Sequence, residues 1–324
     1  MRFLYLALVL SSTLFGSTCQ YTIYPSDVSG DGFVIDKEGT WCLADDVIYD
    51  PTNSNPAITI KASNVQLDLN EKMLTQASKA KPFVVGIAVA PNVTNITISN
   101  GEVKNFSQAG IFVNPPVSLE LFTTKAADKK ALQAKKGKNL LDMAANSSQV
   151  VLDWQPRDQV SDIAIFELTA ENNGLPSFPF AGVNGMGGIV VFNTVEVTIY
   201  ECSCLNNYFS GITGVDVEDF VLADSICEES KASLFVGGAN TFALGALFAS
   251  FTTGSQDIVI RNCSFSAAAE SENSIGLFFN KISDNSYPVD GVEIEDIEAP
   301  IGEDDAGGML LLNVDNVSLR NITI

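Results

Sequence analysis

Acidic and polar residues in the segment SDVSGDGFVIDKEGTW, residues 26–41, have the spacing of a calcium-binding loop. Loop positions one, three, five, six and twelve hold Asp27, Ser29, Asp31, Gly32 and Glu38. This is the EF-hand spacing, in which alternating oxygen ligands and a distal carboxylate surround one Ca²⁺. The same segment also fits a turn of Asp, Gly and Ser residues that leads into a β-hairpin.

The residues that flank this segment favour the turn. An EF-hand requires a helix on each side, yet YTIYPS (21–26) is rich in β-forming residues and is interrupted by proline. After the segment, GTWC (39–42) is a poor start for a helix. We therefore predict strands at 33–35 and 40–43, joined by a turn, and we predict no metal ion or other cofactor.

The chain contains no histidine, and this restricts its chemistry more than any other single fact. Imidazole is unavailable as a general base, as a partner of a nucleophile or as a metal ligand. Ser-His-Asp triads and His-ligated zinc sites are thereby excluded. The six cysteines include no Cys-x-x-Cys pair, so the zinc and thioredoxin patterns are missing as well.

Three carboxylate-rich runs are the remaining candidates for acid–base chemistry. They are Asp45–Asp46, Glu293–Glu298 and Glu303–Asp305. Two carboxyl groups about 5–10 Å apart can act as the acid and the base of glycoside hydrolysis. The alternative is that these runs are solvated turns, and the catalytic residues stay unassigned.

An internal repeat of nine residues predicts the elements that would position such groups. Its copies start at residues 95, 162, 196, 219, 257, 291 and 316 and read NITISNGEV, DIAIFELTA, EVTIYECSC, DFVLADSIC, DIVIRNCSF, GVEIEDIEA and NVSLRNITI. Positions two and four are apolar in every copy, as a strand with one buried face requires. Position six is polar in every copy, which predicts a short strand, a polar bend and a second short strand.

A glycine followed by an apolar run precedes most copies and predicts a third short strand. These runs are GIAV (86–89), GIFV (110–113), GIVV (188–191), GITG (211–214), GLFF (276–279) and GMLL (308–311). Three short strands in roughly 23 residues form one coil of a parallel β-solenoid. Coils stacked about 4.8 Å apart pair every backbone group except at the two ends.

On these motifs the chain resembles the right-handed parallel β-helix proteins of the pectate-lyase-like superfamily. The likeness is strongest in AITIKASNVQLDLNEKMLTQ (57–76) and GIAVAPNVTNITISNGEVKNF (86–106), and it extends with gaps from Ile35 to Ile324. The resemblance implies an all-β, right-handed parallel β-helix with an N-terminal β-cap, here residues 20–56. It implies no single activity, because this fold carries lyases, hydrolases, isomerases and non-catalytic adhesins.

The lyases of that superfamily have their site on the outer face of one strand, where Asp residues hold Ca²⁺ and an Arg or Lys acts as the base. The resemblance implies that the corresponding strand of this chain is the one that begins Gly-Ile. The outward positions of this strand are predicted to hold Ala88, Phe112, Val190, Thr213, Phe278 and Leu311. None of them is a carboxylate. The Gly-His-Gly element of the related hydrolases is impossible without histidine.

An apolar outer strip of this size is expected to be covered or to bind something. A cover is predicted in the insertion 114–160, where Leu119, Phe122, Leu132, Leu140, Leu141 and Met143 have the spacing of one or two amphipathic helices. The same insertion is rich in lysine, with Lys125, Lys129, Lys130, Lys135, Lys136 and Lys138. This basic segment is predicted to be either a solvated helix face, a basic lid for an acidic glycan or an anchor against the acidic C-terminal coils.

A second candidate strip is polar. Arg261 and Arg320 hold position five of their repeats and are predicted to face outward with Tyr200 and Glu295 between them, either as a sugar-binding strip or as salt-bridged surface residues. Together with the apolar strip this defines the predicted binding residues. They are Phe112, Val190, Thr213, Phe278, Arg261 and Tyr200.

The cysteines are expected to be mostly buried thiols. Cys204 and Cys227 both hold position nine of consecutive copies and are predicted to stack one coil apart, where a disulfide is possible. Cys202 and Cys263 share position seven but are two coils apart, about 9.6 Å, which is too far for a bridge.

The start and the charge of the chain predict where it acts. Residues 1–19 are predicted to be a secretory signal peptide, because they contain one basic residue, an apolar run and small residues before a cleavage site near Ser17 to Cys19. The alternative is that Cys19 is lipidated, but the residues before it fit the lipidation pattern poorly. A net charge of −21 excludes nucleic acid as a probable partner, and no later stretch is long and apolar enough to span a membrane.

The sequence therefore predicts a single β-helix domain, residues 20–324, that is secreted or displayed at the cell surface. NVSLRNITI ends at the last position of its repeat, which predicts either end-to-end association or further C-terminal coils. The predicted function is non-catalytic recognition or adhesion, with a polysaccharide or a protein as the partner. The alternative is a polysaccharide lyase or glycoside hydrolase that uses carboxylates, Lys or Arg from long loops.

Overall fold

A computed structural model describes most of the chain as one stack of β-strands. The described residues are 18–79, 83–115, 159–175, 187–231, 233–234, 241–250, 253–267, 274–281, 287–299 and 307–324. Every regular element among them is a strand, from β1 to β21, which confirms the predicted all-β class. The helices predicted in the insertion 114–160 fall on residues 116–158, which lie outside the described residues.

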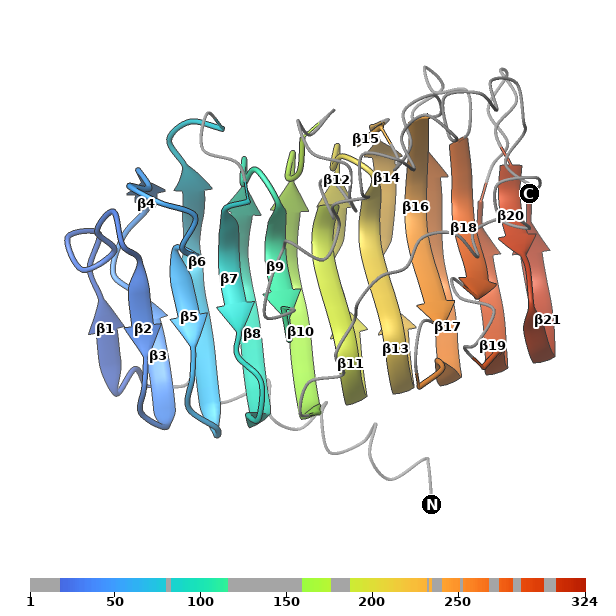
Figure 1. Ribbon diagram of the computed structural model, residues 1–324, viewed down its shortest axis with the longest axis horizontal. Helices are drawn as coiled ribbons and strands as arrows, with labels where there is room; N and C mark the ends of the chain where they lie inside the picture. The colour runs from blue at the N-terminus through green and yellow to red at the C-terminus, as the bar shows by residue number, and fades with distance from the viewer. Residues whose placement is uncertain are drawn as a thin grey trace, which may run out of the picture.

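Successive coils are stacked along the long axis, with β1 at one end and β21 at the other (Figure 1). The first sheet, seen at the front of Figure 1, is built from β2 (Phe33–Ile35), β5 (Ile58–Ile60), β7 (Val85–Val89), β9 (Ala109–Val113), the first halves of β11 (Gly187–Tyr200) and β13 (Ser210–Ala223), β16 (Thr241–Ser250), β18 (Ser274–Lys281) and β20 (Gly307–Leu311). Each of its strands pairs in parallel with the next.

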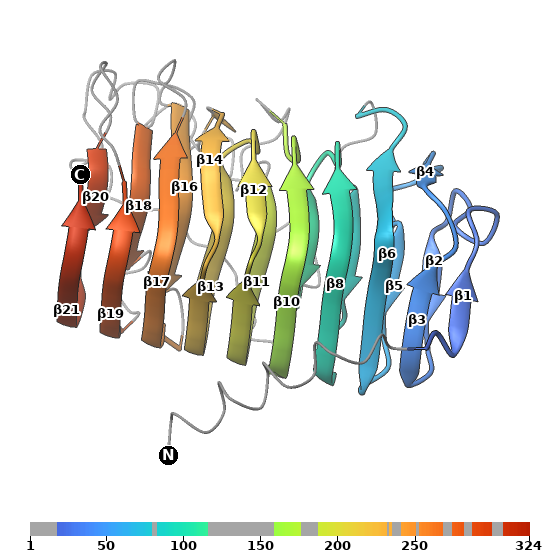
Figure 2. The ribbon, with the colours of Figure 1, turned by 180° about the vertical axis from the view of Figure 1, so that it is seen from behind.

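The second sheet faces the opposite side of the molecule (Figure 2). It contains β1 (Tyr21–Ile23), β3 (Gly39–Leu43), the second halves of β11 and β13, and the first halves of β6 (Val65–Gln76), β8 (Thr94–Lys104), β10 (Val160–Glu171), β17 (Gln256–Ala267), β19 (Val289–Glu298) and β21 (Val314–Thr323).

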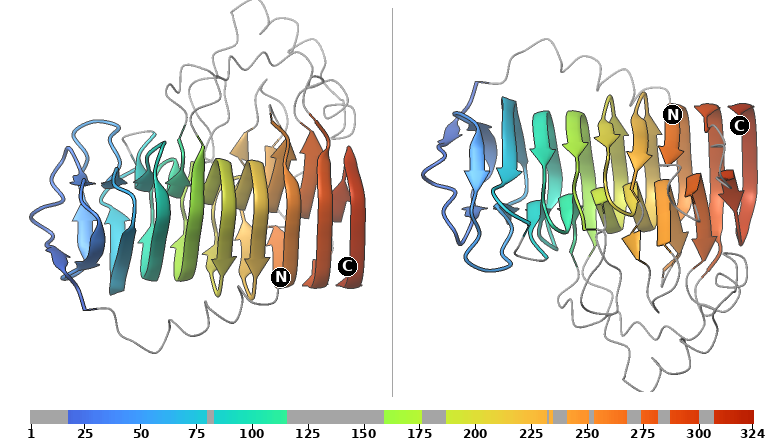
Figure 3. Two further views of the ribbon diagram at one scale, coloured as in Figure 1. Left: turned by 90° about the horizontal axis from the view of Figure 1, so that it is seen from below. Right: turned by 90° about the horizontal axis from the view of Figure 1, so that it is seen from above.

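The third sheet is narrow, because its strands are short. It contains β4 (Val47–Tyr49), β12 (Ser203–Leu205), β14 (Ile226–Ser230) and the second halves of β6, β8, β10, β17, β19 and β21. The stacked coils are seen from two further sides in Figure 3. Among the described strands, only β15 (Ser233–Leu234) pairs antiparallel, with β16. The described strands thus form a parallel β-helix.

The nine-residue repeat is in register between neighbouring coils. Position two of one copy pairs with position two of the next, as in Ile163 with Val197 and Val197 with Phe220. These side chains point inward and belong to a core of stacked apolar residues that runs along the whole described solenoid. The two-residue apolar period therefore predicted the buried face correctly.

The polar bend at position six is also confirmed, and it has a specific backbone conformation. Asn100, Glu167, Glu201, Asp224, Asn262, Asp296 and Asn321 all have positive φ angles, between 49° and 61°. One residue in the left-handed conformation turns the strand from the second sheet into the third without a loop. Asn and Asp tolerate this conformation better than other non-glycine residues, which explains most of the polar residues at position six.

Position one of the repeat makes a second bend of the same kind, which was not predicted. Asn95, Asp162, Glu196, Asp219, Asp257, Gly291 and Asn316 have φ angles between 51° and 65°. Their residue types, Asn, Asp, Glu and Gly, were a visible signal for it.

A row of buried amides fixes the corner between the third sheet and the first. The Oδ1 atom of Asn207 accepts hydrogen bonds from the backbone N–H and the Nδ2 of Asn173, at 2.9 and 3.1 Å. The Nδ2 of Asn207 donates to the carbonyl of Ala170 at 2.8 Å. One coil earlier, the Oδ1 of Asn173 accepts from the N–H of Phe106 at 3.0 Å. The row pairs backbone groups that the bend removes from the sheets.

The N-terminal cap has the predicted strands but not the predicted hairpin. β2 and β3 do not pair with each other, because they lie in different sheets of the first coil and pair with β5 and β6 in the next. The interpretation of a hairpin is therefore wrong, and the cap is itself a parallel coil.

The EF-hand interpretation is wrong as well, because its carboxylates serve separate turns. Asp27 accepts a hydrogen bond from the N–H of Tyr24 at 2.9 Å. Asp31 accepts from Thr52 Oγ1 and Asn53 Nδ2, at 3.0 and 2.9 Å. The described residues on both sides of the segment form strands and turns, not helices.

One disulfide closes the cap and joins Cys19 to Cys42. This pairing was not predicted, since Cys19 was placed in or beside the leader. Because the bond occupies its Sγ atom, a lipid thioether on Cys19 is incompatible with this structure.

Four other cysteines form a buried group of thiols. Cys204 and Cys227 are partners in the pairing of β12 with β14, as predicted, and both are free thiols. Cys202 and Cys263 are free and buried too, with the coil of Ser225 between them. Burial raises the pKa of the Cys202 and Cys227 thiols well above the ordinary value and that of Cys263 to about 12.

We expect the position-one bend to tolerate glycine but not a β-branched residue. Asp257 is exposed and has a φ angle of 52°, so Asp257→Val is expected to cost about 1–2 kcal/mol of unfolding free energy, because its side chain crowds the left-handed backbone. Asp257→Gly is expected to change stability by less than about 1 kcal/mol. Urea unfolding measures both, with Glu218→Val on a neighbouring strand as the control. Equal losses for Val and Gly would contradict the role of the bend.

We expect the buried amide row to contribute strongly to stability. Asn207→Ala removes the partner of Asn173 and of the Ala170 carbonyl, so a loss of about 2–3 kcal/mol is expected in the same unfolding assay. Asn53→Ala is the control, since water can replace the bonds of this exposed side chain, and its effect is expected to stay below about 1 kcal/mol. A loss no larger than that of the control would show that the row is dispensable.

Candidate functional site

The apolar strip predicted on the first sheet exists, and it is buried. Phe112, Val190, Thr213 and Phe278 are 1%, 0%, 2% and 8% exposed. The three apolar members belong to a second hydrophobic cluster, separate from the core inside the coils. The four side chains are thus largely shielded from water. The geometry gives no support to their predicted binding role, which stays a prediction.

One member of the predicted strip was assigned to the wrong face. Leu310, not Leu311, is in register with Phe278, and Leu310 packs against the outer cluster. Leu311 packs against the core inside the coils. The strip also includes Leu247, which is in register with Phe278. It was missed because its strand, TFALGALFAS (241–250), has the small residue alanine after its glycine.

The polar strip predicted on the second sheet runs along position five of the repeat, and its side chains are half-buried or exposed except at Ser99 and Ala223, which are buried. From coil to coil the register brings together Ser99, Phe166, Tyr200, Ala223, Arg261, Glu295 and Arg320. Tyr200 and Arg261 therefore lie on one strip, as predicted. Tyr200 does not lie between the two arginines, because Ala223 separates it from Arg261 on the N-terminal side.

Two stacked rings form the N-terminal part of this strip. The rings of Phe166 and Tyr200 have centroids 4.9 Å apart and an interplanar angle of 15°. Their spacing matches the rise of about 4.8 Å per coil, so the stack follows the solenoid axis. Burial, and then the carboxylates of Glu167 and Glu201, raise the pKa of Tyr200 to about 12. The Tyr200 hydroxyl therefore remains a hydrogen-bond donor at neutral pH.

Charged residues form the C-terminal part of the strip. Arg320 Nη1 donates to Glu295 Oε1 at 2.8 Å, which confirms the salt-bridged alternative for this arginine. Arg261 has no ion pair within 4.0 Å among the described residues. Its half-buried guanidinium is thus the strip's available cation, with five N–H donors in a planar arrangement.

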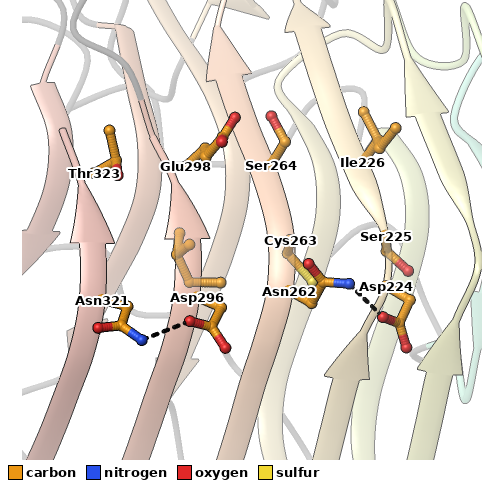
Figure 4. A pocket seen from close by; sticks show the side chains of 11 residues that line it. Asp224, Ser225, Ile226, Asn262, Cys263, Ser264, Asp296, Glu298, Asn321 and Thr323 are labelled. Carbon is orange, nitrogen blue, oxygen red and sulfur yellow. Dashed lines mark hydrogen bonds between the residues drawn. The ribbon is translucent and has the colours of Figure 1, made fainter.

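A shallow groove of about 640 Å³ lies next to the C-terminal part of the strip, at the bend between the second and third sheets. Figure 4 shows its side chains, which come from four successive coils. They include Asp224, Asn262, Asp296 and Asn321 at position six, and Ile226, Ser264, Glu298 and Thr323 beyond the bend. Asn262 Nδ2 donates to Asp224 Oδ1 at 2.6 Å, and Asn321 Nδ2 donates to Asp296 Oδ1 at 2.8 Å.

Two of the groove's three carboxylates, Asp224 and Asp296, hold the same repeat position. Asp224 and Asp296 are separated by the coil of Asn262, which places their backbones about 9.6 Å apart. This backbone spacing is just above the range of about 6.5–9.5 Å found between the two carboxyl groups of inverting glycosidases. Both side chains are exposed and hydrogen-bonded to amides. They lack the apolar enclosure that keeps a catalytic carboxylic acid protonated near neutral pH.

Of the other two predicted carboxylate runs, only Asp45–Asp46 lies in the described part of the chain, and it is away from this groove. Asp46 accepts a hydrogen bond from the N–H of Met73 at 2.9 Å, near the cap, so it has a turn role. The run Glu303–Asp305 lies outside the described residues. No group of three or more acidic or cysteine side chains in the described part of the chain is arranged to hold a metal ion. Likewise, no helix in that part could cross a membrane.

Comparison with known proteins gives a weak likeness in fold only. No family model and no curated protein matches the sequence. Among solved structures, the catalytic domain of a GH87 alpha-1,3-glucanase in complex with nigerose aligns with 93% of this chain and 56% of that chain, at 14% identity and a TM-score of 0.31. A variant of such a domain, also with nigerose, aligns with 94% and 59% of the two chains, at 13% identity and a TM-score of 0.32. The chain thus spans less than two thirds of these structures, and values this low carry no argument about activity.

We expect Tyr200 to make stability depend on alkaline pH. Because its pKa is raised, the folded chain keeps a proton that the unfolded chain loses above pH 10, and stability is lost as the pH rises from 10 towards 12. Urea unfolding is expected to show a steeper loss for the wild type than for Tyr200→Phe over this window. Tyr287→Phe, at an exposed position, is the control and is expected to follow the wild type. Parallel curves for all three proteins would contradict a raised pKa of Tyr200.

Proposed function

We propose that the protein recognises a polysaccharide without cleaving it and holds the polymer along the solenoid axis. The observation that supports this most is the accessible row of hydrogen-bonding side chains over four coils, formed by the groove and the strip beside it. A row of groups repeated about every 4.8 Å is complementary to an extended polymer rather than to a compact ligand.

The groove has unused hydrogen-bonding capacity for sugar hydroxyls. A side-chain amide has two N–H donors, and Asn262 and Asn321 each use one for the neighbouring aspartate. Asp224 and Asp296 each have a second carboxylate oxygen. The Tyr200 hydroxyl and the Arg261 guanidinium supply further donors on the adjoining strip.

The charge of the groove selects a neutral polymer. Asp224, Asp296 and Glu298 lie along it, and the chain as a whole has a net charge of −21. A polymer of uronic acids or sulfated sugars would be repelled here. We therefore expect a neutral glycan in the groove.

Export of the chain is part of the proposal. The N-terminal sequence fits a secretory leader, and the bond between Cys19 and Cys42 is of a kind that persists in oxidising compartments outside the cytoplasm. Since Cys19 is bonded within the cap, we place the end of the leader before Cys19 rather than after it.

A second candidate function is glycoside hydrolysis in the same groove. The spacing of Asp224 and Asp296 favours it, with one carboxyl group as the acid and the other as the base. The exposure of both groups weighs against it, so we rank it below binding. A lyase that uses Lys or Arg from the long loops would draw on residues outside the described ranges. A protein partner on this face is the third outcome of the tests below.

The first experiment measures retention of the purified mature protein by neutral polysaccharides, using affinity electrophoresis and the release of reducing ends. Tyr200→Ala is expected to weaken binding about fivefold to tenfold, the effect of one lost hydrogen bond and its contact. Tyr287→Ala is the matched control and is expected to bind like the wild type.

A paired set of variants separates binding from hydrolysis. Asp224→Asn and Asp296→Asn keep side chains that tolerate the left-handed bend, and Asp219→Asn makes the same change at the other bend. Retention without released ends supports recognition. Hydrolysis would be established if the wild type releases reducing ends, Asp224→Asn or Asp296→Asn abolishes this release, and Asp219→Asn preserves it. Neither retention nor release on any neutral polymer, in folded protein, would overturn the proposal and direct the search to a protein partner.

A further inference from the structure

A cluster of two lysines and one tyrosine lies at the corner between the third sheet and the first, on segments that the proposed groove does not use. Lys79 follows β6, Tyr208 lies between β12 and β13, and Lys231 follows β14. Tyr208 and Lys231 occupy the same position of neighbouring coils, where they form a parallel bridge. Their backbone N–H groups donate to the carbonyls of Asn173 and Asn207, so the buried amide row sets the position of both residues.

Both ammonium groups are directed at one aromatic ring. The Nζ of Lys79 lies 5.3 Å from the centroid of the Tyr208 ring, and the Nζ of Lys231 lies 5.7 Å from it. A cation within about 6 Å of a ring centroid is attracted by the ring quadrupole. The ring thus brings together two charges that repel each other.

Backbone carbonyls hold one of the two cations in place. The Nζ of Lys79 donates to the carbonyl of Asn172 and, at 3.0 Å, to the carbonyl of Gly174. An ammonium group has three N–H donors, so one donor of Lys79 is left for another acceptor. Lys79 and Lys231 are both half-buried, and an interaction made there is screened less than one in bulk water.

Neither lysine has a carboxylate partner within reach in the described ranges. The two ion pairs found there, Lys104 with Glu102 and Arg320 with Glu295, lie elsewhere. Burial, and then the charge of Lys231, lower the pKa of Lys79 to about 8. The chain has a net charge of −21, so two ammonium groups that lie at one ring without a carboxylate partner are unusual in it, and a bound anion would reduce their repulsion.

We propose that Lys79, Tyr208 and Lys231 form a binding site for the anionic group of an acidic saccharide, either a uronate carboxylate or a sulfate ester. The free donors of the two lysines make charge-assisted hydrogen bonds to the oxyanion. The ring of Tyr208 holds the two ammonium groups, and its hydroxyl can hydrogen-bond a hydroxyl group of the adjoining sugar. This site is separate from the groove, which selects against acidic polymers. The two sites would bind different parts of a mixed glycan, or different ligands.

The test is isothermal titration of the mature protein at low salt with four probes. They are an oligogalacturonate, its methyl ester, a sulfated dextran and unmodified dextran. We expect binding of at least one anionic probe, little binding of its neutral counterpart, and an affinity that falls as salt rises. Binding of the oligogalacturonate alone identifies a carboxylate site, binding of the sulfated dextran alone identifies a sulfate site, and binding of both identifies a general oxyanion site.

Charge-removing variants show whether these two lysines are responsible. Lys79→Met with Lys231→Met is expected to lower the affinity for the anionic probe at least tenfold. Lys37→Met with Lys61→Met removes the same charge from exposed positions near the cap and is expected to leave the affinity unchanged. If the double variant at 79 and 231 fails to fold, Lys231→Met alone remains informative, because the side chain of Lys231 makes no hydrogen bond that the described residues show to the backbone.

Two results would overturn the proposal. One is equal affinity of the anionic probe for the wild type and for the folded variants at 79 and 231. The other is no preference of the wild type for either anionic probe over its neutral counterpart. Neither result bears on the groove, whose test uses neutral polymers and Tyr200→Ala, so the two proposals fail separately.

Discussion

The parallel hydrogen bonding between coils, at a rise of about 4.8 Å, is the constraint on which the rest of the structure depends. It holds each residue beside the residue at the same position of the next coil, as Ile163 is held beside Val197. A coil keeps this register only if its strands bend at fixed points. The left-handed residues at positions one and six provide these bends, and the amides of Asn173 and Asn207 pair the backbone at the third corner.

Because of the same constraint, residues at one position of successive coils form a row along the surface. Identical charges in successive coils would lie about 4.8 Å apart and repel each other. In the groove this repulsion is avoided because aspartate alternates with asparagine, so that Asn262 donates to Asp224 and Asn321 to Asp296. On the strip, Glu295 lies between Arg261 and Arg320 for the same reason. Rows that support the fold and rows that present ligand-binding groups are therefore built by one rule.

Much of the fold could be predicted because its rule is local. The apolar period of two in the repeat indicated the inward faces, and the polar residue at position six indicated the bend. What failed depended on contacts between distant segments. Nothing in the sequence near β2 and β3 shows that they join different sheets, and nothing near Phe112 shows that its outward face is buried. The strip with Tyr200 and Arg261 was predicted by counting positions. The contact of Lys79 with the Tyr208 ring was not, because Lys79 reaches this ring from an earlier coil.

The separation of the cysteines within the fold has a consequence for biogenesis. In the oxidising compartment that the proposed export implies, the four thiols at 202, 204, 227 and 263 would be protected by the coils that bury them, since an unfolded chain exposes all six cysteines at once. Cys19 and Cys42 are 23 residues apart and emerge first during synthesis, so they can pair before the later cysteines are available. For an exported chain, correct pairing then depends on the rate of folding. A chain whose coils form before their thiols oxidise keeps the single Cys19–Cys42 disulfide, and a chain whose coils form more slowly acquires mispaired disulfides.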